Sequence, residues 1–449
     1  MKIVIAIDSF KGSMSSIEAG NAAKAGILKA CGEEAEIVVK PLADGGEGTT
    51  EALVEGLGGE YVSVRVTGPL GEKTDARYGI LGDGRTAVME MAEASGIILV
   101  NREELDPLKA TTYGVGEMIL DAVKRGCRDF IIGIGGSATS EGGIGMLQAL
   151  GYEINDADGQ PVKPGLQDME RIASISGEHV SKVLRECHFS IACDVKNPLC
   201  GENGAVYVYG PQKGVREDEK PIFDKKMEHF ADMTREYLER ISGNAGSVGS
   251  DEAAESLAAE DAGSDEASEA SMAGNAGSGE TGEGSMAGDA VSDEASEASM
   301  AEDVCRDYRW TEGAGAAGGL GFAFLSYLPN VELKSGIDIV LEAVGLEEEV
   351  KDADMVITGE GRLDSQTAMG KVPVGVARLA KRYGAQALAF AGGVTKDAGE
   401  CNAAGIDAFF PIVRGVTTLD EAIVPENAKE NMELSVEQVF RAICTSHFT

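Results

Sequence analysis

The chain has 449 residues and a formal net charge of -37, with 76 acidic against 39 basic residues. That length predicts two domains, or three, with an ample hydrophobic core. The acidic balance argues against a nucleic acid or an anionic membrane surface as partner, because both require basic patches. Part of the charge is local, since the stretch from Asn244 to Val304 holds 16 acidic residues and no basic one.

The amino-terminal residues and the cysteines both favour a cytoplasmic protein. Met1 begins a strand-like KIVIAI, without the basic start and long apolar core of a secretory signal, and no apolar run reaches membrane-spanning length. The eight cysteines form no CxxC pair, which suits a reduced cytosol. The cluster of Cys187, His188, Cys193 and Cys200 fits no zinc spacing, so buried thiols are the simpler interpretation.

The first forty residues alternate between strand and helix. Lys2 to Ile7 and Glu36 to Lys40 are predicted strands, and Ser15 with Glu18 forms a capping box for the helix between them. This order predicts a parallel sheet, in which ligands bind at the carboxyl ends of the strands.

Two polar loops follow these strands. Residues 8–13, DSFKGS, include Ser9 and Lys11, and residues 41–48, PLADGGEG, include Asp44. Their place at strand ends predicts a functional role. The structural alternatives are a turn aspartate for Asp44, which precedes a glycine, and a solvated surface charge for Lys11.

The pattern changes between Glu60 and Met91. Period-two alternation on both sides of a Gly-Pro-Leu-Gly turn predicts hairpin strands instead of strand and helix. We therefore expect a second domain to begin near residue 66.

A glycine-rich stretch, Asp129 to Leu147, then reads as a strand, a turn and a helix start. Six glycines fall within thirteen residues, and glycine allows positive φ and close approach of a ligand to the backbone. The following helix would point its amide groups and positive dipole end at an anion. We predict that Gly135, Gly136 and Ser137 bind phosphate. A tight connection without a ligand is the alternative.

The same turn satisfies the dinucleotide pattern GxGxxA. Asp156 and Asp158 lie near the distance at which a ribose-binding acid is expected. A nicotinamide cofactor, and with it an NAD(P)-dependent hydroxy-acid dehydrogenase, therefore stays open.

The second half of the chain supplies further acids and an unusual segment. Asp194 follows a predicted strand, and a helix is expected from Glu217 to Ile241. Residues 242–304 contain SDEASEASMA twice and few large apolar residues, so we predict a disordered acidic insert.

Beyond this segment, GAGAAGGLG matches GxGxxG but follows Tyr308 to Trp310 and no buried strand, so we interpret it as close helix packing or a helix start near a ligand. Strand and helix then alternate again, and the loop from residue 359 to 367 holds Glu360, Arg362 and Asp364. Since this part resembles the first forty residues, we expect one discontinuous domain of residues 1–65 and 305–449, interrupted by a domain of residues 66–241.

Seven blocks in order resemble the bacterial type-1 glycerate kinases: IAIDSFKGSMS, PLADGGEGT, IIGIGGSATSEGGIGMLQALG, ACDVKNPLCGENGAVYVYGPQKG, GAGAAGGLG, SGIDIVL and ITGEGRLDSQTAMGKVPVGVA. The likeness covers nearly everything except residues 242–304. It implies a two-domain α/β protein, with a Rossmann or flavodoxin-like parallel-sheet domain, that transfers the γ-phosphoryl group of MgATP to glycerate and usually gives 2-phosphoglycerate. The chain departs from the family at Ile7, where proline is usual, and at Ser140-Glu141, where Asn-Asp is commoner.

Phosphoryl transfer requires cationic groups for the phosphate, carboxylates for Mg2+ and a base for the hydroxyl. The chain has neither a GxxxxGK[ST] loop nor the HRD and DFG elements of protein kinases. We predict that the residues take these roles: Lys11, Asp44 and Asp194 in catalysis; Ser9, Gly135, Gly136, Ser137, Arg362 and Asp364 in binding substrate or phosphate; Asp44, Asp194 and Glu360 in binding metal. A non-catalytic regulator that binds a sugar acid or phosphate is a further alternative. A homodimer is one option, and the product and glycerate enantiomer stay open.

Overall fold

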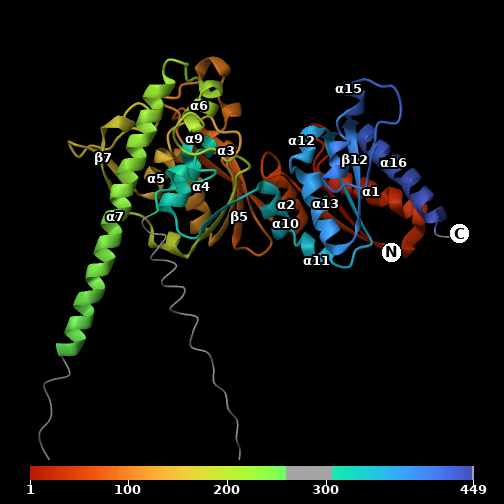
Figure 1. Ribbon diagram of the computed structural model, residues 1–449, viewed down its shortest axis with the longest axis horizontal. Coiled ribbons are helices and arrows are strands. Elements are labelled where there is room, and N and C mark those ends of the chain that lie inside the picture. Colours follow the sequence, from red (N-terminus) through yellow and green to blue (C-terminus); the bar gives the residue numbers. More distant parts are fainter. Residues whose placement is uncertain (259–305, 447–449) are drawn as a thin grey trace, which may run out of the picture. The chain divides into compact units, whose positions relative to one another are not determined.

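The computed structural model describes residues 1–258 and 306–446. The described residues divide into two compact units, one within residues 1–230 and 308–446 and the other within residues 231–258 and 306–307. The first unit contains two sheets that are wholly or partly parallel, with helices around them (Figure 1), so the predicted α/β class is confirmed. No helix in the described part of the chain is long and apolar enough to cross a membrane.

The first sheet has five strands in the order β13-β12-β11-β1-β2, and every neighbouring pair is parallel. Its strands are β1 (Lys2–Ile7), β2 (Glu36–Pro41), β11 (Met355–Leu363), β12 (Gln386–Val394) and β13 (Ala408–Pro411). Numbered along the chain, this is the 2-1-3-4-5 order of flavodoxin-like folds. The strand order of this sheet reverses between β1 and β11, and flavodoxin-like sheets bind ligands at the corresponding point.

Helices cover both faces of this sheet. Alternate residues of β1 belong to two separate hydrophobic clusters: Ile3 and Ile5 pack with α1 (Ser16–Cys31) and α16 (Pro425–Ser446), and Val4 packs with α13 (Val372–Tyr383). This two-sided burial explains why KIVIAI is apolar throughout. The capping box of Ser15 and Glu18 forms as predicted.

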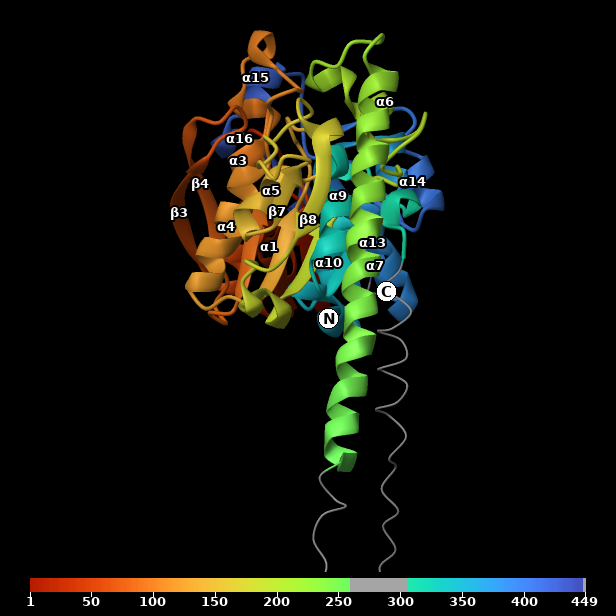
Figure 2. The ribbon, with the colours of Figure 1, turned by 90° about the vertical axis from the view of Figure 1, so that its left-hand side faces the viewer.

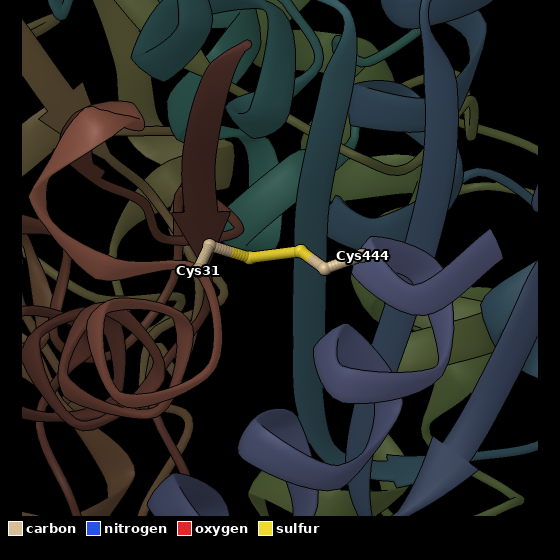
Figure 3. The surroundings of a disulfide bond; sticks show 2 residues. All are labelled: Cys31 and Cys444. Carbon is tan, nitrogen blue, oxygen red and sulfur yellow. A yellow bond between two sulfur atoms is a disulfide. The ribbon is translucent and has the colours of Figure 1, made fainter. Parts of the chain in front are cut away.

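Helices α1 and α16 lie side by side (Figure 1), and a disulfide joins Cys31 to Cys444 (Figure 3). Here the structure differs from the expected set of reduced thiols. The pairing depends on two helix ends that are 413 residues apart in the sequence, so no CxxC pattern could indicate it. The three cysteines of the Cys187 cluster form no disulfide, and Cys187 and Cys200 are buried.

The second sheet has six strands in the order β10-β9-β6-β5-β4-β3. The pairs from β10 to β5 are parallel, whereas β5, β4 and β3 run antiparallel to one another, which confirms the predicted hairpin. Strands β3 and β4 of this hairpin lie side by side (Figure 2). The strands are β3 (Glu60–Thr67), β4 (Lys73–Ile80), β5 (Thr86–Glu90), β6 (Asp129–Gly133), β9 (His188–Ala192) and β10 (Val331–Lys334).

Two strands pair in the other sheet from the one that the predicted domain division implies. Residues 60–65 and 331–334 were expected in the discontinuous first domain, yet β3 pairs with β4 and β10 pairs with β9 in the six-stranded sheet. Cross-strand pairing, which sequence periodicity does not report, decides the sheet to which a strand belongs. The division into domains at residues 65, 241 and 305 stays a prediction.

The remaining elements connect these sheets. A small sheet pairs β7 (Glu153–Asp156) with β8 (Ile172–Ser176). The other helices that the site involves are α2 (Thr49–Leu57), α4 (Tyr113–Lys124), α5 (Ile144–Leu150), α9 (Ala316–Tyr327), α10 (Gly336–Ala343) and α12 (Ser365–Ala368).

Helix α7 (Lys220–Ala258) is longer than predicted. Residues 242–258 were expected to be disordered, but in the structure they continue this helix. Alanine, glutamate and leucine, which are strong helix formers, recur in DEAAESLA at its end. Residues 259–304 of the predicted insert lie outside the described residues.

Candidate active site

Three loops meet at glycines where their backbones come close. A Cβ added to Gly45, after β2, would lie 2.3 Å from the Cα of Gly336 at the start of α10. A Cβ added to Gly133, at the end of β6, would lie 2.7 Å from the carbonyl oxygen of Gly45. Only residues without a Cβ allow this approach. The contact brings the loop after β2 beside the end of β6.

Asp44 and Asp194 lie at this junction. The Oδ1 atom of Asp44 accepts from the amide of Gly46 at 3.0 Å, and Oδ1 of Asp194 accepts from the amide of Gly336 at 2.9 Å. Both side chains line the same two cavities, of about 500 and 420 Å³. The cavity walls remove water from Asp194, and this burial together with the charge of Asp44 raises its pKa. The structure therefore brings together two of the predicted catalytic acids.

Further carboxylates occupy the point where the strand order of the first sheet reverses. Asp8 follows β1 and Glu360 lies in β11, and both are buried, with 7% and 8% of their surface exposed. Burial and the charges of Asp44 and Glu360 raise the pKa of Asp8 to about 7. Burial also raises the pKa of Glu360, whose Oε1 accepts from the hydroxyl of Thr367. The prediction did not include Asp8, although its position directly after a strand was a signal.

Mg2+ usually takes one or two carboxylates and completes its octahedral shell with water and substrate phosphates. Asp44 and Asp194 fit that requirement as a pair of hard oxygen donors lining one cavity. Within residues 1–258 and 306–446, no group of three or more His, Cys, Asp or Glu side chains is placed to hold a metal ion. A complete cage from Asp44, Asp194 and Glu360 is therefore not formed in this structure.

The glycine turn after β6 forms another wall of the 420 Å³ cavity through Gly135, Gly136 and Ser137. Gly136 has a φ of +71°, which favours glycine, whereas Gly135 does not require a left-handed backbone. A Cβ added to Gly135 would meet no atom within 4 Å. Gly135 thus faces open space, as a residue that a ligand approaches would.

The start of α5 does not face that cavity with free amides. Glu141 is fully buried, and its Oε1 accepts from the amides of Thr112 at 2.7 Å and Gly145 at 3.0 Å. Its Oε2 accepts from the amide of Gly165 at 2.7 Å. The expectation that this helix end binds the anion is wrong, because a carboxylate of the protein occupies it. Glu141 thereby holds three segments together around the turn.

Lys213 is a site residue that the prediction missed. It is 2% exposed, and its Nζ donates to Ser137 Oγ at 2.6 Å and to the carbonyl oxygen of Thr139 at 2.7 Å. It lines the same cavity as Asp194. Burial lowers the pKa of Lys213 to about 7. The sequence showed only a lysine among turn residues, because its partners are 74 and 76 residues away.

The other predicted residues lie elsewhere. Ser9 and Lys11 line a separate cavity of about 300 Å³ between the loop after β1 and α2. Asp364 is the N-cap of α12 and accepts from the amides of Gln366 and Thr367 at 3.0 and 3.3 Å. Arg362 Nε lies 3.6 Å from Asp364 Oδ2, and the arginine side chain is 70% exposed. The structure gives Asp364 a capping role and does not place it in the cavity over the glycine turn.

The second glycine-rich stretch, GAGAAGGLG, begins α9 and packs tightly. A Cβ added to Gly318 would lie 2.1 Å from the carbonyl oxygen of Thr139, and Gly318 has a φ of +70°. The packing interpretation is confirmed. Asp156 accepts from the amides of Asp158 and Gln160 and pairs with Arg171, so it stabilises the turn after β7 and is not presented to a ribose.

Comparison with known proteins gives consistent results. A family model described as the glycerate kinase family matches residues 3–273 and 279–444. A glycerate kinase of Bacillus subtilis is 42% identical over 443 residues, covering 99% of this chain and 98% of the relative. A glycerate 2-kinase of Escherichia coli is 40% identical over 422 residues, covering 94% and 93%. The crystal structure of a putative glycerate kinase 2 from Salmonella typhimurium has a TM-score of 0.79 and 37% identity, and covers 100% of both chains.

These matches also correct the expected extent of the resemblance. The family model omits only residues 274–278 between its two matched ranges, so most of the acidic segment 242–304 falls within it. The small polar residues of segment 242–304 form no long motif by which its resemblance to the family could be recognised in the sequence. The family model and these relatives cover nearly all of the chain, so the chain belongs to the glycerate kinase family.

Proposed function

We propose that this protein is an ATP-dependent glycerate kinase that forms 2-phosphoglycerate. The observation that carries the proposal is one cavity that Asp44 and Asp194 line together with the open glycine turn. Carboxylates in the lining suit a metal-bound nucleotide, and exposed backbone in the same lining suits phosphate oxygens. Family membership supports glycerate as the acceptor, and the relative named glycerate 2-kinase supports the 2-phospho product.

In this proposal the residues of the chain bind and orient the reactants. Asp44, with Asp194 beside it, would hold Mg2+, which when bound offsets the charge of the phosphate oxygens. The backbone at Gly135 and Gly136 cradles the phosphates. The hydroxyl oxygen of glycerate forms a bond to the γ-phosphorus as the bond from that phosphorus to the oxygen of ADP breaks. Asp194, whose raised pKa makes it a stronger base than an ordinary aspartate, accepts the hydroxyl proton.

The test uses the purified full-length chain. We expect MgATP and D- or L-glycerate to give ADP and a phosphoglycerate, whose position of phosphorylation carbon NMR identifies. Parallel reactions with NAD(P) and glycerate test the dehydrogenase alternative. Reduction of nicotinamide, or binding of glycerate without ADP formation, would contradict the proposal. The cytoplasmic location and the homodimer stay predictions.

A further inference from the structure

We propose that Lys213 is the cationic anchor for a phosphate group of the nucleotide in the cavity over the glycine turn. The inference rests on the proposed function for the identity of the nucleotide. It assigns to Lys213 a binding role that neither the sequence prediction nor the family match supplies.

Lys213 is a buried basic group without an acidic partner in the described part of the chain. Lys213 is 2% exposed, and among the residues that the structure describes no acid acts on its pKa, which burial alone shifts. Its two hydrogen-bond partners, Ser137 Oγ and the Thr139 carbonyl, are neutral. Burying an ammonium without a counter-charge is costly, so proteins pair such groups or use them to bind anions.

The hydrogen bonds of Lys213 leave one of its donors unused. An ammonium group has three N–H donors, and these two acceptors leave one for a group in the cavity that Lys213 lines. Ser137 lines the cavity as well, and Gly135 beside it leaves open space. Lysine, serine hydroxyl and exposed backbone amides are the donors that phosphate sites commonly combine.

A comparison with Lys226 separates anion binding from a structural clamp. Lys226 Nζ also donates to a backbone carbonyl, that of Leu166 at 2.7 Å, but it pairs with Glu170 at 2.7 Å as well. Its charge is thereby compensated within the protein. Lys213 holds a backbone carbonyl in the same way but lacks such an acid, so its charge is left for a ligand.

Protonation gives a distinct signature. Burial lowers the pKa of Lys213 to about 7 in the free protein, and a bound anion raises it again. Above pH 7, binding of phosphate therefore takes up a proton, and affinity falls as the pH rises. Below pH 7 the lysine already carries that proton. The other titratable groups lining the cavity are Asp44, Cys193, Asp194 and Tyr209.

The experiment is calorimetric titration of the full chain with MgATP and, separately, with glycerate. Lys213→Met should weaken MgATP binding roughly a hundredfold, leave glycerate affinity within about twofold, and keep or raise the melting temperature. Lys213→Arg should retain more affinity than Lys213→Met. Lys226→Met is the matched control: it should lower the melting temperature and leave MgATP affinity unchanged.

The wild-type protein supplies a test that needs no variant. Titrations at pH 8 in two buffers of different ionisation enthalpy should show uptake of a substantial fraction of a proton per MgATP bound. No proton uptake, or MgATP affinity within twofold of wild type in Lys213→Met, would overturn the inference. Loss of glycerate binding with MgATP binding retained would assign the lysine to the substrate carboxylate and overturn it too. Binding is measured without turnover, so a protein that binds MgATP through Lys213 but phosphorylates another acid refutes only the proposed function.

Discussion

The carboxyl ends of the two sheets carry different sets of charged groups. The five-stranded sheet gathers Asp8 and Glu360 near Asp44, and these carboxylates act on one another electrostatically. The six-stranded sheet instead ends β6 in a glycine turn beside Lys213, a buried cation with neutral partners. The five-stranded side thus gathers acids that repel one another, whereas the six-stranded side combines Asp194, after β9, with a buried lysine whose hydrogen-bond partners are neutral.

The contrast explains how an acidic protein can bind a polyanion. In the proposed function a metal ion would offset the carboxylates and phosphate oxygens would offset the lysine, so a metal-bound nucleotide would satisfy both kinds of group at once. The close glycine contacts of Gly45 with Gly133 and Gly336 hold the two sides together. The following predictions test each side separately.

The largest effect is expected at the junction. Asp194→Asn should lower glycerate kinase turnover by roughly a hundredfold or more, because a charged group that acts in the transition state is lost. Steady-state kinetics with MgATP and glycerate measure this. Asp338→Asn is the control, since this exposed acid lies near Asp194 but hydrogen-bonds to Ser335. Turnover near that of wild type in Asp194→Asn would remove Asp194 from the catalytic residues.

The next effect tests the acidic side through stability. The pKa of Asp8 is raised from 3.8 to about 7 in the folded protein, so between these values the folded state holds a proton that the unfolded state has released. Stability should fall as the pH rises through this range. Asp8→Asn has no carboxyl group to deprotonate. The difference between its free energy of unfolding and that of wild type should therefore grow by about 2 kcal/mol from pH 5 to pH 8, as followed by chemical denaturation.

Asp352→Asn supplies the opposite case. The pKa of Asp352 is lowered by its hydrogen bond to Lys2, so this variant should not gain stability over wild type as the pH rises. If the free energies of unfolding of Asp8→Asn and wild type differ by a constant amount from pH 5 to pH 8, Asp8 is not subject to repulsion by the neighbouring carboxylates.

The glycine side should respond more weakly. Gly135→Ala places a methyl group in open space, so stability should change little while MgATP affinity falls about tenfold because the phosphate loses its approach. Gly399→Ala is the control, because a Cβ there also meets no atom within 4 Å but lies outside the cavity. Equal MgATP affinities in the two variants would show that the turn contacts no phosphate.

The smallest effect concerns Asp364. As the N-cap of α12 it should contribute about 1 kcal/mol, so Asp364→Ala should lower the free energy of unfolding by that amount and Asp364→Ser should restore most of it. If Asp364→Ser has its stability restored but shows no glycerate kinase activity, the carboxylate binds substrate, as predicted from the sequence.

Sequence patterns located the strand ends but not the contacts between segments. Asp44 and Asp194 were found because each follows a strand, and strand ends of parallel sheets gather on one edge. Lys213 was missed because its bonds reach across more than seventy residues. The capping of α5 by Glu141 and the disulfide of Cys31 with Cys444 depend on tertiary packing in the same way.

The two glycine-rich stretches show the same limit. Both match a nucleotide-binding pattern, yet Gly135 faces open space and Gly318 contacts a backbone carbonyl. A glycine indicates that a side chain is excluded, and only the three-dimensional surroundings show whether a ligand or the protein excludes it.

The most direct test of the central claim is a crystal structure of the protein with Mg2+ and a non-hydrolysable ATP analogue. We expect phosphate oxygens within about 3 Å of Lys213 Nζ and of the amides at Gly135 and Gly136, with the metal ion bound by Asp44 or Asp194. Phosphates bound instead in the separate cavity lined by Ser9 and Lys11, with the glycine turn empty, would contradict the account.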